Sequence, residues 1–462
     1  MPKINNETDL QYKRRVIDIK SESFCGAKWY NATIWLGSGQ TTSCHHPLPH
    51  QVSIEAVEVN PKALHNTPEK KHQRLQMQQG ERPAGCEYCW KIEDMHKNDE
   101  RYAKGDHPVP ISDRVYKTVI YSDKDLDEAY RTPAEQDVDL QTLEIAFDRT
   151  CQFACSYCNP AFSSTWVKDI KQHGAYTNLV SDGRNHFTHT HDSSQLYKFG
   201  ETNPYVEAFH KWWETDLHRT LKELRITGGE PLMSAETWRL IEWFKTNKGK
   251  SSTRLAINSN LGTAVDVDRL LAAIDGVEVD LYTSNESMGL HAEYIRDGLV
   301  FDDWANNVER LLQSYKFRGL HVMCTINALC LDSLPDFLEM IMNWKREYGK
   351  DAVNFSLNIL RFPSFQSLTV LPDTVRQDYL SKLIEFATRY QTTNYDEMHE
   401  FEYNQFIRLL DYIREVNQAH SEAMSQSILQ RDFKNFYMQY DQRRGKDFCS
   451  TFPNLAEWYK TL

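Results

Sequence analysis

The chain has 462 residues, more than one hydrophobic core normally serves, so we expect two or three structural units. Hydrophobic residues make up 40% of it and aromatic residues 12%, which suits a globular protein and excludes a collagen-like or disordered chain. The formal net charge of −12 gives an acidic surface that repels phosphate backbones, so general nucleic-acid binding is not expected.

The sequence also bears on the cellular compartment. No apolar run approaches the length that crosses a bilayer, and the polar N-terminus is unlike a signal peptide. We therefore expect a cytoplasmic protein with no membrane partner. Seven of the ten cysteines precede residue 160. In a chain without a secretory signal, closely spaced cysteines favour metal or redox chemistry over disulfides.

In chain order, the sequence predicts three regions. Residues 1–135 form a small Cys-rich module with short strand-like stretches at Asn31–Leu36 and Val52–Val59, and an acidic, linker-like segment covers 122–139. Residues 136–372 alternate between strands and helices, and residues 373–462 have the apolar spacing of a helical C-terminal extension.

The middle region carries the fold prediction. Its six expected strands are Thr142–Phe147, Leu224–Thr227, Thr253–Asn258, Val277–Tyr282, Leu320–Ile326 and Ala352–Leu357. Helical stretches lie between them, among them Ala235–Thr246, Val265–Ala273, Trp304–Ser314 and Leu334–Glu347. Such alternation predicts parallel βαβ units in an α/β fold, either a partial barrel or an open sheet. In both, ligands gather at the carboxyl ends of the strands.

Three cysteines follow the first of these strands: Cys151, Cys155 and Cys158 form a C-x3-C-x2-C motif. A loop of this kind can place three thiolates at three corners of a [4Fe–4S] cubane. The fourth iron then lacks a protein ligand, and a catalytic metal keeps such a position open. A zinc knuckle or ordinary core cysteines are the alternatives, but no fourth ligand follows at zinc spacing.

The motif and its surroundings resemble the radical S-adenosylmethionine superfamily. Tyr157 is the aromatic residue that precedes the third cysteine in that family. A GGEP-type motif follows the second strand, made by Gly228, Gly229, Glu230 and Pro231. The resemblance implies a partial (β/α)6 barrel that holds a [4Fe–4S] cluster and S-adenosylmethionine. It also implies that the backbone of the motif and Glu230 contact the amino group of S-adenosylmethionine.

Further cofactor-binding positions follow from the same resemblance. Ser284 and Glu286 are similar to the family's Ser-x-Asp stretch, which meets the ribose, with Glu286 in the place of the aspartate. Arg296 is similar to an arginine that meets the S-adenosylmethionine carboxylate in relatives. A guanidinium fork matches a carboxylate well, although a surface ion pair is the other interpretation of Arg296.

A second set of cysteines lies in the N-terminal module: Cys25, Cys44, Cys86 and Cys89. A C-x2-C turn presents two thiolates to one metal, and two remote cysteines complete a closed shell, as in structural or electron-transferring sites. The pattern resembles the twitch or SPASM-like auxiliary-cluster modules of the family, although those usually follow the barrel. The resemblance favours an auxiliary [4Fe–4S] cluster over zinc, and ligation by His45 in place of one cysteine stays open.

The resemblance implies an enzyme that cleaves S-adenosylmethionine reductively to a 5′-deoxyadenosyl radical for hydrogen abstraction. A flavodoxin- or ferredoxin-type protein is the expected electron donor. The expected substrate is a peptide or protein side chain, and a small molecule such as a nucleotide or sugar derivative is the alternative. The second hypothesis is a non-catalytic iron–sulfur or zinc protein, a carrier or scaffold, which has no need of the GGEP-type motif.

Overall fold

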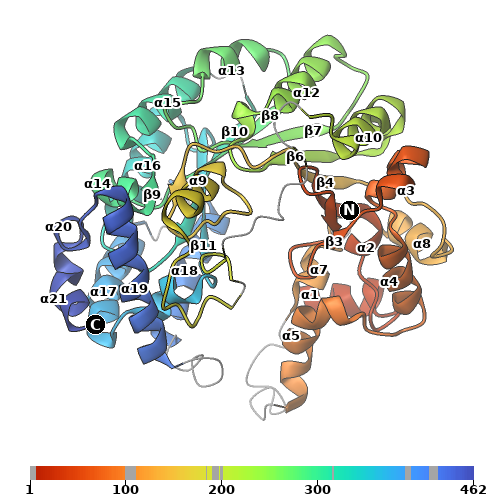
Figure 1. Ribbon diagram of the computed structural model, residues 1–462. Coiled ribbons are helices and arrows are strands. Elements are labelled where there is room, and N and C mark those ends of the chain that lie inside the picture. Colours follow the sequence, from red (N-terminus) through yellow and green to blue (C-terminus); the bar gives the residue numbers. More distant parts are fainter. Residues whose placement is uncertain are drawn as a thin grey trace. The chain divides into compact units, whose positions relative to one another are not determined.

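The computed structural model describes residues 7–98, 111–183, 185–189, 197, 201–314, 317–390, 397–415 and 425–462. Their contacts divide the chain into two compact units, whose elements are labelled in Figure 1. The first unit comprises Met1–Phe147, Leu196–Arg225 and Gly249–Arg254, and the second comprises Asp148–Gln195, Ile226–Lys248 and Leu255–Leu462.

The first unit contains a small mixed sheet. Its strands are β1 (Asn31–Trp35), β2 (Gln40–Thr42), β3 (His50–Gln51) and β4 (Thr142–Ala146). β1 pairs antiparallel with β2 and parallel with β4, and β2 pairs antiparallel with β3. The register places Ile34 opposite Ile145, and both are fully buried. The predicted strand at Asn31–Leu36 is thus confirmed, one residue shorter.

Two sequence predictions for this unit are wrong. The stretch Val52–Val59 forms a helix, α3 (Ile54–Val59), because the Ser53 side chain accepts a hydrogen bond from the Ala56 N–H and caps it. The segment taken for a linker contains α8 (Asp123–Arg131), which Ser122 caps in the same way. α8 buries Leu126 and Ala129, so this helix has an apolar face although most of its residues are polar or acidic.

Short helices build most of the first unit. They are α1 (Asp9–Tyr12), α2 (Ala27–Tyr30), α4 (Pro68–Gln78), α5 (Glu87–Asn98), α7 (Asp113–Tyr116) and α10 (Pro204–Trp212), with a π-helical turn, η1 (Lys13–Ile17), and a 3-10 turn, η3 (Ala84–Cys86). A core of aromatic and aliphatic side chains joins several of them, among them Tyr12, Phe24, Trp29, Met77 and Trp90. This core lies beside the N-terminal cysteines and fixes the segments that carry them.

The second unit contains a parallel sheet. Its strands β7 (Arg254–Asn258), β8 (Val279–Ser284), β10 (Gly319–Ile326) and β11 (Val353–Ile359) pair in that order, all in parallel. Helices α13 (Val267–Ala273), α15 (Phe301–Ser314) and α16 (Leu334–Tyr348) alternate with them, and α12 (Ala235–Thr246) precedes β7. The predicted βαβ alternation is confirmed here. β6 (Glu223–Thr227) crosses from the first unit into the second along the chain.

Helices also form the C-terminal part of the second unit: α17 (Asp373–Tyr390), α18 (Glu400–Glu415), α19 (Gln426–Arg444), α20 (Phe448–Thr451) and α21 (Pro453–Thr461), drawn in blue in Figure 1. α19 buries one aromatic face, which includes Phe433, Phe436 and Tyr440. Tyr440 donates a hydrogen bond to the Tyr294 carbonyl oxygen (3.0 Å). The helix is therefore packed into the unit by large rings as well as by polar contacts.

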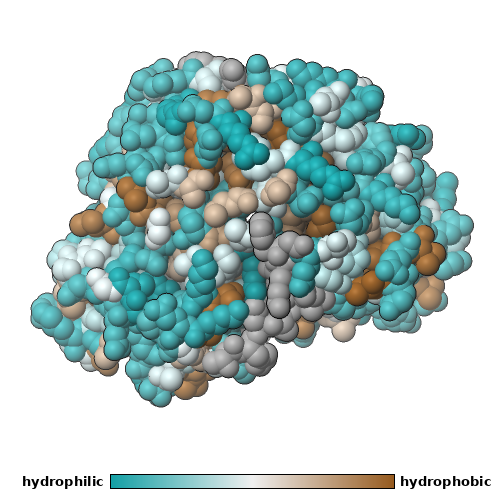
Figure 2. Space-filling model, turned by 45° about the horizontal axis from the view of Figure 1, so that its top comes forward, coloured by the Kyte–Doolittle hydropathy of each residue, from teal (hydrophilic) through white to brown (hydrophobic). Residues whose placement is uncertain are grey.

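Figure 2 shows one face, on which polar side chains predominate and hydrophobic ones form small groups. No helix in the described part of the chain has the length and apolar character of a membrane span.

A buried ion pair joins α16 to α18. Lys345 Nζ lies 3.0 Å from Glu402 Oε2, and the two side chains are 1% and 0% exposed. Glu402 Oε1 also accepts the Phe355 N–H of β11 at 2.9 Å.

We expect Lys345→Met to lower the free energy of unfolding by about 3–5 kcal/mol, because Glu402 is left buried without its cation. Urea unfolding followed by circular dichroism measures the change.

Lys382→Met is the matched control. Its ammonium pairs with Asp332 but is 51% exposed, so its loss is expected to cost less than about 1 kcal/mol. Equal destabilisation by the two variants would contradict a specific role for the buried pair.

Candidate functional site

The loop after β4 carries Cys151, Cys155 and Cys158, and it opens the second unit. The Cys158 N–H donates to the Cys155 carbonyl oxygen (2.9 Å), which turns the backbone between these two cysteines. At the start of α9 (Ser164–His173), the hydroxyls of Ser164 and Thr165 donate to the Cys151 carbonyl oxygen at 3.1 and 2.7 Å. Hydrogen bonds therefore hold the loop at both ends.

The middle of the loop is held by a short strand pair. β5 (Ala154–Cys155) pairs antiparallel with β9 (Arg296–Asp297), which places Cys155 opposite Arg296. The Trp166 indole N–H donates to the Cys155 carbonyl oxygen at 2.9 Å. Neither contact was foreseen from the sequence, because β9 is only two residues long and pairs across 141 positions of the chain.

The three thiols neighbour one another. Burial raises the pKa of the Cys151 thiol to about 12, and the nearby Cys155 thiol adds to the rise. Burial also raises the pKa of Cys158, with further contributions from Cys155 and Cys151. Three adjacent thiolates repel one another unless a cation lies among them, and metal coordination deprotonates a thiol outright. The donor set therefore fits a cationic iron–sulfur core.

The GGEP-type segment packs directly on this loop. The Glu230 N–H donates to the Thr150 carbonyl oxygen at 2.7 Å. A Cβ atom on Gly229 would lie 2.4 Å from that oxygen and 2.6 Å from the Arg149 carbonyl oxygen. Gly228 has φ of 136°, a conformation that other residues rarely adopt. Both glycines are therefore required by the backbone, and Pro231 follows as the first residue of η5 (Pro231–Met233).

The Glu230 carboxylate joins the ends of two neighbouring segments. Its Oε1 accepts the Leu232 N–H (3.0 Å) and the Ser259 hydroxyl (2.9 Å). Its Oε2 accepts the Asn260 N–H at 2.6 Å. Burial raises the pKa of this carboxyl to about 7, although the hydrogen bonds oppose the rise. A carboxylate offers about four acceptor sites, so three donors leave about one for a ligand.

Asn260 connects Glu230 to the cysteines. Its Nδ2 lies 3.8 Å from Cys151 Sγ, and its Oδ1 accepts from Gln152 Nε2 at 2.9 Å. Ser259 and Gln152 were not predicted from the sequence as part of this arrangement. The available signal was a run of short polar side chains directly after a parallel strand, where ligands gather.

Tyr157, Glu286 and Arg296 form a second buried group. Arg296 Nη2 lies 2.6 Å from Glu286 Oε2, and the side chains are 5% and 0% exposed. The Tyr157 hydroxyl donates to Glu286 Oε1 at 3.2 Å, and Arg296 Nη1 lies 3.9 Å from Cys155 Sγ. The ion pair of Arg296 is therefore buried rather than at the surface. The roles of Glu286 at the ribose and Arg296 at the carboxylate stay predictions.

Ser284 is the last residue of β8 and is half-buried. The next residue, Asn285, turns the chain, since its Oδ1 accepts the N–H groups of Glu286 (2.8 Å) and Ser287 (3.3 Å). The turn directs the Glu286 side chain to Arg296. Ser284 thus lies at the carboxyl end of a parallel strand, two residues from this ion pair.

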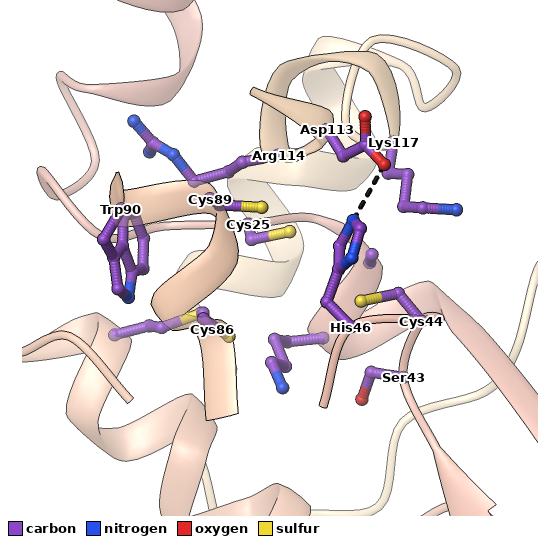
Figure 3. A pocket seen from close by; sticks show the side chains of 13 residues that line it. Cys25, Ser43, Cys44, His46, Cys86, Cys89, Trp90, Asp113, Arg114 and Lys117 are labelled. Atoms are coloured by element: carbon purple, nitrogen blue, oxygen red, sulfur yellow. Dashed lines mark hydrogen bonds and ion pairs between the residues drawn. The ribbon is translucent and has the colours of Figure 1, made fainter. Parts of the chain in front are cut away.

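The four N-terminal cysteines meet in the first unit. Cys25, Cys44, Cys86 and Cys89 line one pocket with about 380 Å³ of empty space, its opening included. Figure 3 shows their sulfur atoms directed into it. Burial raises the pKa of the Cys25 thiol to about 11, with smaller contributions from the thiols of Cys44 and Cys86. Cysteines that are up to 64 positions apart are thus brought to one space, as a four-thiolate ligand set requires.

The histidine that lies at this pocket is His46, which follows the predicted alternative ligand His45 in the sequence. His46 is among the lining residues, where its Nε2 lies 2.8 Å from Asp113 Oδ2 and its ring stacks on Tyr88. His45 is exposed and is not among the residues that line the pocket. In the described part of the chain, no three His, Cys, Asp or Glu side chains converge closely enough to hold a single metal ion.

Comparison with known proteins gives a weak likeness. No protein-family model matches the chain, and no curated protein matches it. Among solved structures, anSMEcpe with bound AdoMet has 13% identity and a TM-score of 0.37 over 56% of this chain and 63% of that one. SuiB of Streptococcus suis bound to S-adenosylmethionine has 11% identity and a TM-score of 0.36 over 70% and 64%.

A structure of TYW1 with a lysine-pyruvate adduct bound has 14% identity and a TM-score of 0.26 over 54% of this chain and 70% of that one. In the two alignments with bound AdoMet or S-adenosylmethionine, the chain spans less than two thirds of the length of anSMEcpe and SuiB. Its function has to be argued from its own residues.

We expect Gly229→Ala to separate the GGEP-type segment from the cysteine loop, since its Cβ would meet the Thr150 carbonyl oxygen at 2.4 Å. Overpacking against backbone costs about 1–3 kcal/mol, so Tm should fall by several degrees. The iron bound after anaerobic reconstitution should fall as well. Differential scanning calorimetry and iron analysis measure the two effects.

Gly183→Ala is the control, because no atom lies within 4 Å of the added Cβ and the residue has no positive φ. If Gly229→Ala behaves like Gly183→Ala in both measurements, the close approach does not matter for the site.

Proposed function

We propose that the chain is a radical S-adenosylmethionine enzyme, with a [4Fe–4S] cluster held by Cys151, Cys155 and Cys158. When bound, the cluster supplies the electron that cleaves S-adenosylmethionine into methionine and a 5′-deoxyadenosyl radical, which abstracts hydrogen from a substrate. The observation that carries the proposal is the packing of three adjacent thiols against a GGEP-type backbone segment.

The surrounding residues position this site. Hydrogen-bond donors face two of the sulfur atoms: the Phe153 N–H and Asn260 Nδ2 lie 3.4 and 3.8 Å from Cys151 Sγ, and Arg296 Nη1 lies near Cys155. Such donors stabilise negative charge on sulfur and tune the cluster. The glycines allow a ligand to approach the backbone closely. Gly228 to Pro231 are the proposed contacts of the methionine moiety.

The ribose of S-adenosylmethionine is assigned to the carboxyl end of β8 and its carboxylate to the start of β9. Ser284 is the proposed ribose contact, and Arg296 the proposed carboxylate contact. Glu286 holds the Arg296 guanidinium in place, and Tyr157 donates to Glu286, so this pair acts in our proposal by orienting the arginine. A guanidinium has five N–H donors, so one carboxylate partner leaves others for a ligand.

A second, auxiliary [4Fe–4S] cluster is proposed in the N-terminal module, which is then a twitch or SPASM-like domain placed before the barrel. Its support is the convergence of Cys25, Cys44, Cys86 and Cys89 on one pocket. Four thiolates close the ligand shell, so this cluster transfers electrons or stabilises the module and does not bind substrate.

The proposed substrate is a peptide or protein side chain, as for relatives with auxiliary clusters. A small molecule such as a nucleotide or sugar derivative is the alternative, and so is a non-catalytic carrier or scaffold. The proposed electron donor is a flavodoxin- or ferredoxin-type protein. The formation of 5′-deoxyadenosine above the substrate-free rate, measured with peptides and with small metabolites in parallel, distinguishes the two substrate classes.

Anaerobic reconstitution with iron and sulfide, followed by dithionite and S-adenosylmethionine, tests the activity. We expect methionine and 5′-deoxyadenosine in equal amounts, measured by liquid chromatography and mass spectrometry. Cys155→Ala should reduce the yield at least about 100-fold, because one of the three thiolates is lost. Cys449→Ala, outside both cysteine sites, is the control and should retain activity. Loaded clusters without 5′-deoxyadenosine would favour the carrier hypothesis.

A further inference from the structure

The pocket of the four N-terminal cysteines has a cationic wall. Three of its lining residues are basic: Lys28, Arg114 and Lys117. Asp113 is the one carboxylate among the described lining residues, and it pairs with His46 at 2.8 Å. The buried Arg114 is balanced outside the pocket by Glu93 (2.7 Å) and Asp18 (3.1 Å). Lys28 and Lys117 therefore supply the remaining positive charge of the wall.

Lys28 is the more buried of the two lysines. It is 2% exposed, and its Nζ donates to the Gln73 side-chain oxygen at 2.5 Å. It lines the same pocket as Cys86, and its positive charge opposes the rise that burial causes in the pKa of the Cys86 thiol. Within the described ranges no carboxylate lies within ion-pair distance of this ammonium. Its charged partner in the fold is therefore a sulfur ligand of the proposed cluster.

Two more buried cations lie behind Lys28. Lys70 and Arg74 of α4 are both 0% exposed. Lys70 Nζ donates to Thr41 Oγ1 at 3.0 Å, and Arg74 donates to the Lys28 carbonyl oxygen (3.0 Å) and to Asn66 Oδ1 (2.9 Å). All of these acceptors are neutral. Burial, together with Arg74 and Lys28, holds the pKa of Lys70 well below its usual value, and burial lowers the pKa of Arg74 to about 10. An anionic group close by stabilises the charged form of both side chains.

Backbone N–H groups also lie close to two of the thiols. The Ala27 N–H opposes the rise that burial causes in the pKa of the Cys25 thiol. The Arg114 N–H does the same at Cys89. With Lys28 near Cys86, three of the four thiols have an N–H group or a positive charge close by. Each such interaction is stronger when the sulfur carries more negative charge.

Four thiolates around an oxidised [4Fe–4S]2+ core carry a net charge of −2, and uptake of one electron makes it −3. Positive charges in a low-dielectric wall stabilise the more negative state more strongly. A zinc ion with four thiolates also carries −2, but it takes up no electron. The positive charges of the wall therefore affect the reduction of a [4Fe–4S] cluster, whereas a zinc site has no reduction for them to affect.

We propose that Lys28, supported by Lys117, Lys70 and Arg74, raises the one-electron reduction potential of the cluster at Cys25, Cys44, Cys86 and Cys89. The cluster is thereby an electron-accepting centre rather than a purely structural one. A reduced flavodoxin- or ferredoxin-type donor gives up one electron, the core passes from 2+ to 1+, and no bond forms or breaks. The inference rests on the proposed function, in that these cysteines hold a [4Fe–4S] cluster.

The test isolates the N-terminal cluster in the full-length chain. A variant with Cys151→Ala, Cys155→Ala and Cys158→Ala keeps only the four-cysteine site. After anaerobic reconstitution, iron and sulfide analysis should give about one [4Fe–4S] cluster per chain. Its midpoint potential is then measured by redox titration with dithionite, followed by electron paramagnetic resonance of the reduced cluster.

In this background, Lys28→Met should lower the equilibrium constant for reduction at least about tenfold, which is about 59 mV for a one-electron couple. Lys28→Arg keeps the charge and should restore most of the potential. Lys117→Met, at a half-buried position, should shift the potential in the same direction and serves if Lys28→Met does not fold. Lys71→Met is the control, because Lys71 neighbours Lys70 on α4 but is paired with Asp137 at 2.6 Å.

The outcomes separate the two claims. An intact cluster whose potential is unchanged or raised in both Lys28→Met and Lys117→Met overturns the inference and leaves the proposed enzyme activity standing. Zinc in the isolated site also overturns it. Failure of the proposed function is seen independently, as absence of 5′-deoxyadenosine from the wild-type protein, and does not alter the redox titration.

Discussion

The carboxylate of Glu230 is the interaction on which the arrangement of the second unit's site depends. Its own N–H binds the Thr150 carbonyl oxygen, and its side chain binds Ser259 and Asn260. Asn260 in turn faces Cys151. One residue thus holds the cysteine loop, the GGEP-type segment and the end of β7 in a single network. The approach of the loop to Gly229 is possible because no Cβ intervenes.

The two cysteine sites differ in their electrostatics. Near the three-cysteine loop the Arg296 guanidinium is neutralised by Glu286 in a buried pair. Around the four-cysteine pocket, Lys28 and Lys70 are buried without carboxylate partners in the described part of the chain. Positive charge favours the reduced state of an anionic cluster, so the second environment would favour electron uptake by the proposed auxiliary cluster more than the first would by the proposed catalytic one. This difference suits an auxiliary centre that exchanges electrons with its surroundings.

Sequence periodicity predicted much of the second unit, because its strands carry buried apolar residues, as β7 does at Leu255, Ala256 and Ile257, and helical stretches separate them. It failed where a local cap or a long-range pairing decides the structure. Ser53 converts an apparent strand into a helix, and Glu286 meets Arg296 only through the fold. The cysteine spacing is the basis of both proposed ligand sets, which stay predictions. The buried lysines were missed, since composition does not reveal which charges pack against thiols.

The central claim is that the three-cysteine cluster has an open iron that binds S-adenosylmethionine. A variant with Cys86→Ala and Cys89→Ala keeps only this cluster, and its reduced state is measured by electron paramagnetic resonance before and after S-adenosylmethionine is added. The account predicts a change in the g-values of the cluster, because the ligand enters the iron's coordination shell. An unchanged spectrum from a fully loaded, reduced cluster would contradict it.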